Sequence, residues 1–258
     1  MSDLLTDPTP RRGFVARLAA ATAALGAGLH GHAAGAQPPA AAAGRARAAA
    51  ASEPPVVGDW DMSWVDRLTS SRRQVFDAPE VAEGMALHQL RAWLQGYEDV
   101  YGAAGKDANA VLVVRHFGIP LVMGDALWDR YQLGQKMSAF TADKQPLKDP
   151  ATGEPARRHP YLNANVKQGD KHASMYVAMW PDSGIDSLLK RPGVTVLACN
   201  LALQFIANTV VAPQDGVSNE EALKRVKADL LPGVIVMPSG IFAVGRAEEA
   251  GCRYIYSA

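Results

Sequence analysis

The sequence predicts a three-layer α/β/α domain built on a five-stranded, mainly parallel β-sheet. Two observations predict it: apolar segments of strand length, and helix-length segments that alternate with them along the chain. Strands that alternate with helices of ten or more residues form crossover units, and crossover units give a mainly parallel sheet. We expect the domain to span residues 59–258, and we find no internal repeat.

Five segments have the length and composition of strands. Two of them, 110–115 and 193–198, are near-continuous apolar runs, which are typical of strands covered on both faces. The other three strands are expected at 72–77, 234–237 and 252–256.

The first helix is expected to begin at Pro79, because a proline in the first turn lacks only an N–H that has no helical partner anyway. Gly102 and Gly105 end it. Apolar residues recur along it at helical spacing and predict one buried stripe. This stripe consists of Leu87, Leu90, Leu94 and Tyr97.

Four further helices are expected at 182–190, 200–211, 219–230 and 239–250. Ser239 is a natural N-cap for the last helix and Gly251 is a natural stop. Between the second and third strands, a helix at 125–133 precedes an inserted loop at about 134–172, which is rich in Lys, Pro and Asp. Other residues expected to be buried are Val196, Phe205, Val234 and Ile255.

Composition excludes several classes of protein. The chain of 258 residues carries 26 basic and 26 acidic side chains, and this neutral balance argues against a nucleic-acid partner. Two cysteines cannot form a disulfide framework or a Cys-only zinc site. The histidines lack metal-ligand spacing, so we predict no metal site. No phosphate-binding loop follows a strand, which argues against a dinucleotide enzyme, and no cofactor is predicted.

The first 36 residues are typical of a twin-arginine signal peptide. Arg11 and Arg12 precede a short Ala-rich apolar run, and Ala34–Ala36 offers a small-residue cleavage site before Gln37. A membrane anchor is the alternative, but the run is shorter than the ~20 apolar residues that a spanning helix needs. We therefore expect the twin-arginine export machinery as a partner, a periplasmic or secreted location, and no stable membrane anchor.

Residues 37–58 are rich in alanine and proline and contain almost no large apolar side chains. Such a segment buries too little surface to offset the loss of chain entropy on folding. We expect a flexible linker there.

Two reactive side chains directly follow predicted strands. His116 comes after the strand that ends at Arg115, and Cys199 comes after the strand that ends at Ala198. Ligand sites in open parallel sheets lie beyond the carboxyl ends of the strands. Cys199 also opens a predicted helix, whose unpaired N–H groups favour a thiolate. The alternative is that Cys199 only packs, as we expect for Cys252 in the last strand.

Several segments together resemble the DsrE/DsrF family. These are the Ala-Cys-Asn segment within 194–203, the Leu-Pro-Gly segment at 231–233 and the Met-Pro-Ser-Gly segment at 237–240. In addition, Arg115-His116 and Asp125–Trp128 resemble an exported branch of that family. The resemblance implies a five-stranded, flavodoxin-related fold that assembles into homo-oligomers. It also implies that Cys199 carries a persulfide. We expect His116, at the end of the adjacent strand, to accept the proton of the thiol. Asn200, Arg115 and Asp125 are the expected substrate-binding residues.

This sequence departs from the family's sulfur-relay proteins in its export signal and in its inserted loop. Three functions therefore stay open. The first is an exported sulfur carrier that uses Cys199 and exchanges sulfur with a partner protein or a small thiol. The second is a non-catalytic module that binds a small molecule or a metal cofactor. The third is a subunit of an oligomeric assembly in which Cys199 only packs.

Overall fold

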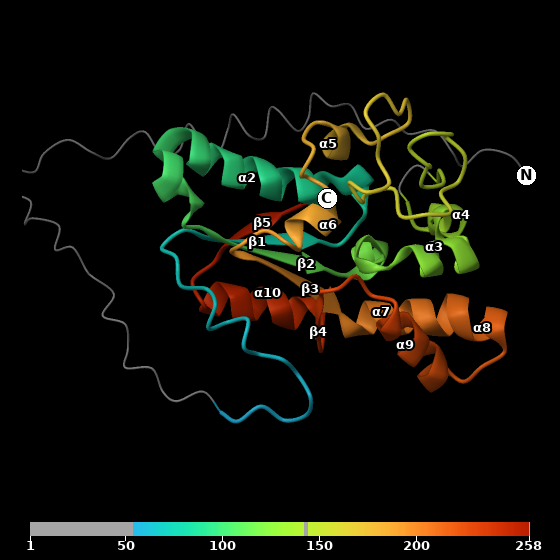
Figure 1. The fold of residues 1–258 in the computed structure, drawn as a ribbon. Coiled ribbons are helices and arrows are strands. Elements are labelled where there is room, and N and C mark those ends of the chain that lie inside the picture. Colours follow the sequence, from blue (N-terminus) through green and yellow to red (C-terminus); the bar gives the residue numbers. More distant parts are fainter. Residues whose placement is uncertain (1–53, 142–143, 258) are drawn as a thin grey trace, which may run out of the picture. The chain divides into compact units, whose positions relative to one another are not determined.

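The computed structural model describes residues 54–141 and 144–257 (Figure 1). The predicted signal peptide lies outside the described residues, as does most of the predicted linker. Five strands form one sheet: β1 (Arg73–Ala78), β2 (Asn109–Val114), β3 (Val194–Cys199), β4 (Ile235–Met237) and β5 (Arg253–Tyr256).

All neighbouring strands are parallel, and their order across the sheet is β4-β3-β2-β1-β5. The predicted three-layer architecture is therefore confirmed. From β1 to β4 the chain moves one strand at a time in one direction, and it then returns to the opposite edge to form β5. Right-handed crossovers require the first connections to cover one face and the last connection to cover the other.

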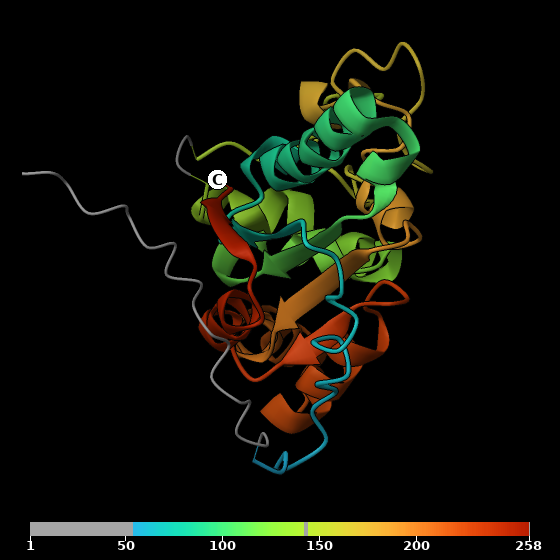
Figure 2. The same cartoon turned by 90° about the vertical axis from the view of Figure 1, so that its left-hand side faces the viewer.

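The helices follow this rule. Figures 1 and 2 show α2 on one side of the sheet and α10 on the other. The helices are α2 (Met85–Tyr101), α3 (Asp125–Tyr131), α4 (Leu133–Lys136), α5 (Met175–Ala178), α6 (Ile185–Leu188), α7 (Asn200–Ile206), α8 (Ala212–Asp215), α9 (Asn219–Ala228) and α10 (Gly240–Glu249). Short 3-10 turns are η2 (Ala82–Gly84), η3 (Gly102–Lys106), η4 (His116–Val122) and η5 (Met137–Ala139).

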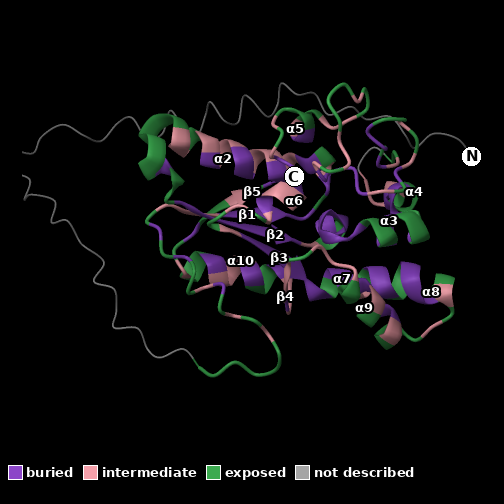
Figure 3. Cartoon of the chain, in the orientation of Figure 1, coloured by how far each residue is buried: buried purple, intermediate pink, exposed green. Residues whose placement is uncertain are grey.

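The side chains of β2 divide the hydrophobic core into two parts, and the whole strand is buried. Leu112 and Val114 belong to a cluster with residues of α2, α7 and α9. Val111 and Val113 belong to a cluster with α10 and Trp64. Figure 3 shows the buried residues gathered in the central strands and on the inner sides of these helices.

The start expected for the first helix at Pro79 is wrong, because α2 begins at Met85. Ala82 and Glu83 have positive φ angles of 39° and 54°, and Gly84 follows with 84°. An α-helix needs negative φ throughout, so these residues prevent the helix from starting earlier. The predicted stripe of leucines on α2 is buried, whereas Tyr97 is half-buried.

Two other helices differ from their predicted ranges. The helix expected at 182–190 is the single turn α6, because Gly184 is extended and its N–H donates to the side chain of Asn163 at 2.5 Å. The helix expected at 200–211 continues through a π-turn at Ala207–Val211 into α8. Pro213 lacks the N–H that would bond to the carbonyl four residues earlier, which accounts for the wider turn before it.

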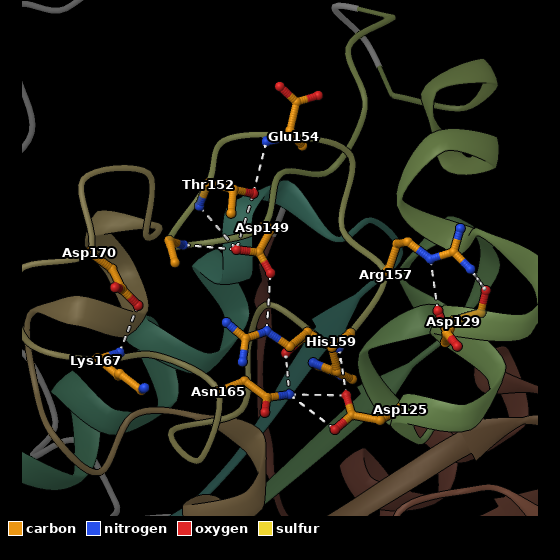
Figure 4. Close-up of polar contacts among 12 residues, drawn as sticks. Asp125, Asp129, Asp149, Thr152, Glu154, Arg157, His159, Asn165, Lys167 and Asp170 are labelled. Atoms are coloured by element: carbon orange, nitrogen blue, oxygen red, sulfur yellow. Dashed lines mark hydrogen bonds and ion pairs between the residues drawn. The ribbon is translucent and has the colours of Figure 1, made fainter.

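Carboxylates hold the inserted segment in place (Figure 4). Asp125 Oδ1 accepts hydrogen bonds from the backbone N–H of His159 at 2.7 Å and from the Nδ2 of Asn165 at 3.0 Å. Arg157 pairs with Asp129 at 2.7 Å. These contacts dock the segment against α3 without any sheet pairing, so the insertion forms a wall beside the carboxyl edge of the sheet.

Among the described residues, no helix combines the length and apolar character needed to span a bilayer.

Three residues that the sequence predicted to be buried are partly exposed in the structure. Phe205 is 36% exposed, and Val234 and Ile255 are half-buried. Val234 precedes the short edge strand β4 and Ile255 lies in the other edge strand, β5, so neither is covered by a second strand on its outer side.

Candidate functional site

His116 and Cys199 emerge at the same edge of the sheet. β2 and β3 are neighbours, and Val114 pairs with Ala198 at their carboxyl ends. His116 lies two residues beyond Val114, and Cys199 lies one residue beyond Ala198. Two reactive side chains that are 83 positions apart in the sequence are thus brought to one place by the parallel register.

A cavity of about 230 Å³ opens at this edge, and we call it the cysteine pocket. Its walls come from residues 115–117 after β2, from Cys199 and three residues of α7 (Leu201, Ala202 and Phe205), and from residues 239–241 after β4. The carboxyl ends of three adjacent strands therefore form the site. The position of the cysteine pocket agrees with the usual position of ligand sites in open α/β sheets.

Cys199 ends β3 and directly precedes the first turn of α7. Its residue surface is 5% exposed, and the side chain borders the cysteine pocket. The thiol makes no capping hydrogen bond to the helix. The free N–H groups of the first turn and the positive end of the helix dipole lie beside the thiol and favour an anion there.

A buried ion pair fixes Arg115 at the pocket wall. The Nε and Nη2 atoms of Arg115 donate to the two carboxylate oxygens of Asp77 at 2.7 and 2.8 Å. Asp77 is 2% exposed and also accepts a hydrogen bond from the Tyr254 hydroxyl at 2.9 Å. The hydrogen bonds to Asp77 raise the pKa of Arg115 above its usual range. The guanidinium of Arg115 therefore stays protonated at the wall of the pocket that holds the thiol, with its charge paired to the carboxylate of Asp77.

Arg115 also determines the proton position on His116. The Nη1 of Arg115 lies 3.3 Å from the Nδ1 of His116. Because a guanidinium can only donate, Nδ1 is the acceptor and the neutral ring carries its hydrogen on Nε2. His116 thus presents an N–H donor, which suits the stabilisation of a thiolate. The expected role of His116 as the acceptor of the thiol proton requires this contact with Arg115 to break.

The backbone around His116 is strained and tightly packed. His116 has a φ of 44°, which non-glycine residues rarely adopt and which occurs preferentially at functional sites. At the facing wall, a Cβ on Gly240 would lie 2.5 Å from the Cβ of Arg115, so only glycine fits there. Ser239 caps α10 by accepting the N–H of Phe242 at 3.1 Å.

Two of the predicted substrate-binding residues are not part of the cysteine pocket. Asp125 is occupied in anchoring the inserted segment (Figure 4). Asn200 is buried next to Cys199, and its Oδ1 has no hydrogen-bond partner among the described residues, but it does not line the cavity. The pocket therefore brings together Cys199, His116 and Arg115 from the predicted set.

Cys252, His159 and His88 have structural surroundings, whereas His172 lines a different and larger cavity. Cys252 precedes β5 at the opposite end of the sheet, and burial raises its pKa to about 11. His159 is fully buried, with a hydrogen bond at each ring nitrogen. His88 stacks on Trp180 at 4.9 Å between ring centroids. In the described part of the chain, His, Cys, Asp and Glu side chains form no group of three that could hold a metal ion.

Sequence reasoning missed the apolar walls of the cysteine pocket. Phe117 and Phe205 lie 6.1 Å apart between ring centroids, and Leu201 and Ile241 are 58% and 67% exposed. Residues 239–241 could have been predicted as part of the pocket, because they follow β4 as His116 follows β2 and as Cys199 ends β3. The sequence pattern did not indicate that Phe205 lines the pocket, because its spacing on the helix fits a core position equally well.

Comparison with known proteins found no match among family models, curated proteins or solved structures.

Proposed function

We propose that the protein is an exported sulfur carrier of the DsrE/DsrF type, in which Cys199 holds a persulfide. The observation that supports the proposal most strongly is the cysteine pocket itself. It places a thiol at a helix start in one cavity with the guanidinium of Arg115, which is paired with Asp77, and with a histidine N–H donor. Such surroundings stabilise a thiolate, and the thiolate is the form of cysteine that attacks sulfur.

The transfer conserves atoms and electrons. The Cys199 thiolate attacks the outer sulfur of a donor persulfide, R–S–SH, so that a new S–S bond forms and the donor S–S bond breaks. The donor leaves as the thiolate R–S⁻, and the outer sulfur and its hydrogen remain on Cys199. An acceptor thiolate then attacks the same outer sulfur, which releases Cys199 as a thiolate. His116 and Arg115 stabilise the negative charge on Cys199 before and after each transfer.

The proposed cellular setting follows from the twin-arginine signal predicted at residues 1–36. In the periplasm or outside the cell, the donor and the acceptor are a partner protein or a small thiol. Exposed apolar side chains at the pocket mouth, such as Leu201 and Ile241, suit contact with such a partner or with a second copy of the chain in a homo-oligomer.

A non-catalytic binding module remains the second candidate. The observation that favours it is the apolar character of most of the pocket wall, which includes Phe117, Phe205 and Ile241. A pocket of this kind binds a small apolar molecule without any chemistry at the thiol. In that case Cys199 contributes only to packing.

Release of stored sulfur separates the two functions. The purified chain is incubated with inorganic polysulfide, freed of excess reagent and treated with a dithiol, and the sulfide released is measured. The sulfur-carrier function predicts about one sulfide per chain, none from Cys199→Ser, and an unchanged yield from Cys252→Ser. The variant His116→Gln should slow loading by about 100-fold, the usual effect of losing one donor to a developing anion. An equal yield from Cys199→Ser would favour the binding module.

A further inference from the structure

A second and larger cavity lies next to the cysteine pocket, and we call it the insertion pocket. Its volume is about 590 Å³, which is within the range of small-molecule sites. One wall is the segment 80–83 that follows β1, and the opposite wall is formed by the inserted segment. Phe117 lines both cavities, so the two pockets are neighbours at the carboxyl edge of the sheet.

Opposite charges line the insertion pocket without neutralising each other. Glu80 and Glu83 lie on one wall and Lys148 lies on the other. Within the residues that the structure describes, none of these three side chains forms an ion pair. The pocket therefore offers separate positions for a positive and a negative group of one ligand.

One largely buried side chain at the pocket wall has a hydroxyl that forms no hydrogen bond with the described residues. Tyr161 lines the pocket and is only 4% exposed, yet its hydroxyl makes no hydrogen bond with any described residue. Buried polar groups are nearly always hydrogen-bonded, to protein, water or ligand. Burial, followed by the negative charge of Glu83, raises the pKa of Tyr161, so the hydroxyl stays protonated and available as a donor.

The wall that carries the carboxylates is strained. Ala82 and Glu83 are consecutive non-glycine residues with positive φ angles of 39° and 54°. Ser174 holds this turn from outside by donating a hydrogen bond to the carbonyl of Glu83, and within the turn the N–H of Gly84 donates to the carbonyl of Val81 at 2.7 Å. Strained backbone of this kind is concentrated at ligand clamps and active sites.

We propose that the insertion pocket binds a small zwitterionic thiol or its persulfide, a molecule with both an ammonium and a carboxylate group. The inference rests on the proposed function of Cys199 and names the class of its small-molecule donor. Glu80 and Glu83 bind the ammonium group, beside the aromatic faces of Phe117 and Phe140. Lys148 binds the carboxylate.

The aromatic residues between the two pockets provide the route for the sulfur. Phe117 stacks on Phe140 at 4.7 Å between ring centroids and meets Phe205 edge-on at 6.1 Å. Phe140 lines the insertion pocket and Phe205 lines the cysteine pocket. Sulfur makes favourable contacts with aromatic rings, so these side chains suit a sulfur atom that extends from one pocket toward Cys199.

Calorimetry with a sulfur-blocked probe tests binding apart from transfer. The probe is the S-methyl derivative of the tripeptide γ-Glu-Cys-Gly, titrated into the full chain. We expect binding that weakens at least about tenfold in Glu83→Gln and in Lys148→Met, the loss expected for one charge-assisted contact. Glu220→Gln and Lys190→Met, which change exposed charges outside the pocket, should bind like the unchanged protein. Absence of binding, or equal binding by all four variants, would overturn the proposal.

Loading kinetics separate the inference from the proposed function. The persulfide of the same tripeptide should load Cys199 more slowly in the two pocket variants, whereas inorganic polysulfide, which has no organic part, should load them at the unchanged rate. If wild-type protein loads from polysulfide but shows no preference for the tripeptide persulfide, the insertion pocket has another role and the sulfur-carrier function stands. If the probe binds but neither donor loads Cys199, the sulfur-carrier function fails and the pocket remains a zwitterion site.

Discussion

Cys199 and Cys252 lie at opposite ends of the sheet. Burial raises the pKa of Cys252 to about 11, so only about one thiol in a thousand is ionised at pH 8. Cys199 borders a cavity that the guanidinium of Arg115 and the ring of His116 also line. Iodoacetamide at pH 8, followed by peptide mass analysis, should therefore modify Cys199 first. The variants Cys199→Ser and Cys252→Ser assign each rate, and faster labelling of Cys252 would contradict the account.

His159 makes folding sensitive to mild acid. Its ring is fully buried, and burial lowers its pKa from 6.5 to about 4. As the pH falls below 6.5, the unfolded chain binds a proton that the folded chain excludes, so the free energy of unfolding decreases. The loss develops between pH 6.5 and 4 and totals about 3 kcal/mol, at ~1.4 kcal/mol per pKa unit.

Urea titrations of the wild-type protein and of His159→Gln across this range measure the effect. The variant should be less stable at pH 7, because it loses the fitted contacts with the carbonyl of Leu121 and the N–H of Tyr161. Its stability should change less between pH 6.5 and 4 than that of the wild type. Parallel pH curves for the two proteins would show that His159 is not the group responsible.

The sequence predicted that Cys199 and His116 lie at strand ends, but it did not predict the electrostatic partners of the pocket residues. Cys199 and His116 directly follow apolar runs, so the position of strand ends identified both. Asp77 lies 38 positions before Arg115, and Tyr254 lies 177 positions after Asp77. These residues meet only because β1 lies between β2 and β5, an order that no local pattern reveals.

Helix α2 allows a matched test of the core. Leu90 is fully buried on its inner side, whereas Val100 is 71% exposed near its end. Leu90→Ala should lower the free energy of unfolding by about 2–5 kcal/mol, because it removes buried surface and leaves a cavity. Val100→Ala should change it by less than about 0.5 kcal/mol. Urea unfolding measures both, and a stability unaffected by Leu90→Ala would show that this face of α2 is not packed.

Helix α10 contains two glycines with opposite environments. A Cβ on Gly240 would collide with Arg115, whereas a Cβ on Gly245 would meet nothing within 4 Å. Gly245→Ala should raise the melting temperature, since alanine favours a helix by about 1 kcal/mol over glycine. Gly240→Ala should lower the melting temperature and displace Arg115 from His116. Equal effects of the two substitutions on the melting temperature would show that Gly240 is not closely packed against Arg115.

At the scale of elements, all five strands were predicted to within about one residue of their observed ends. The helices were less predictable, because tertiary contacts decide their ends. Asn163 holds Gly184 extended before α6, and the left-handed residues at 82–84 delay α2 until Met85. Helix propensity does not predict either of these helix starts, since one depends on the inserted segment and the other on the conformation of a pocket wall.

The predicted export signal bears on the location of the whole molecule. Arg11 and Arg12 lie outside the described residues, and the prediction rests on the sequence alone. Changing both to lysine should leave the precursor in the cytoplasm, because the twin-arginine pathway depends on that pair. Cell fractionation with antibody detection measures the distribution. Export at the usual level would show that another signal directs the chain.

The whole fold explains why one sheet edge carries two pockets. Three consecutive crossovers place the ends of β1, β2, β3 and β4 side by side, and the inserted segment between β2 and β3 adds a wall beyond that edge. The sequence predicted the insertion at about 134–172, but its packing depends on carboxylate contacts between distant residues, as Figure 4 shows for Asp125 and Asn165. The insertion pocket was therefore not predictable from local patterns.

The intact mass of the protein after incubation with inorganic polysulfide shows directly whether Cys199 holds a persulfide. We expect a gain of about 32 Da, one sulfur atom, that peptide mapping assigns to Cys199. The gain should persist in Cys252→Ser and disappear in Cys199→Ser. A folded protein whose Cys199 stays unmodified, or one that carries the added sulfur on Cys252, would contradict the account.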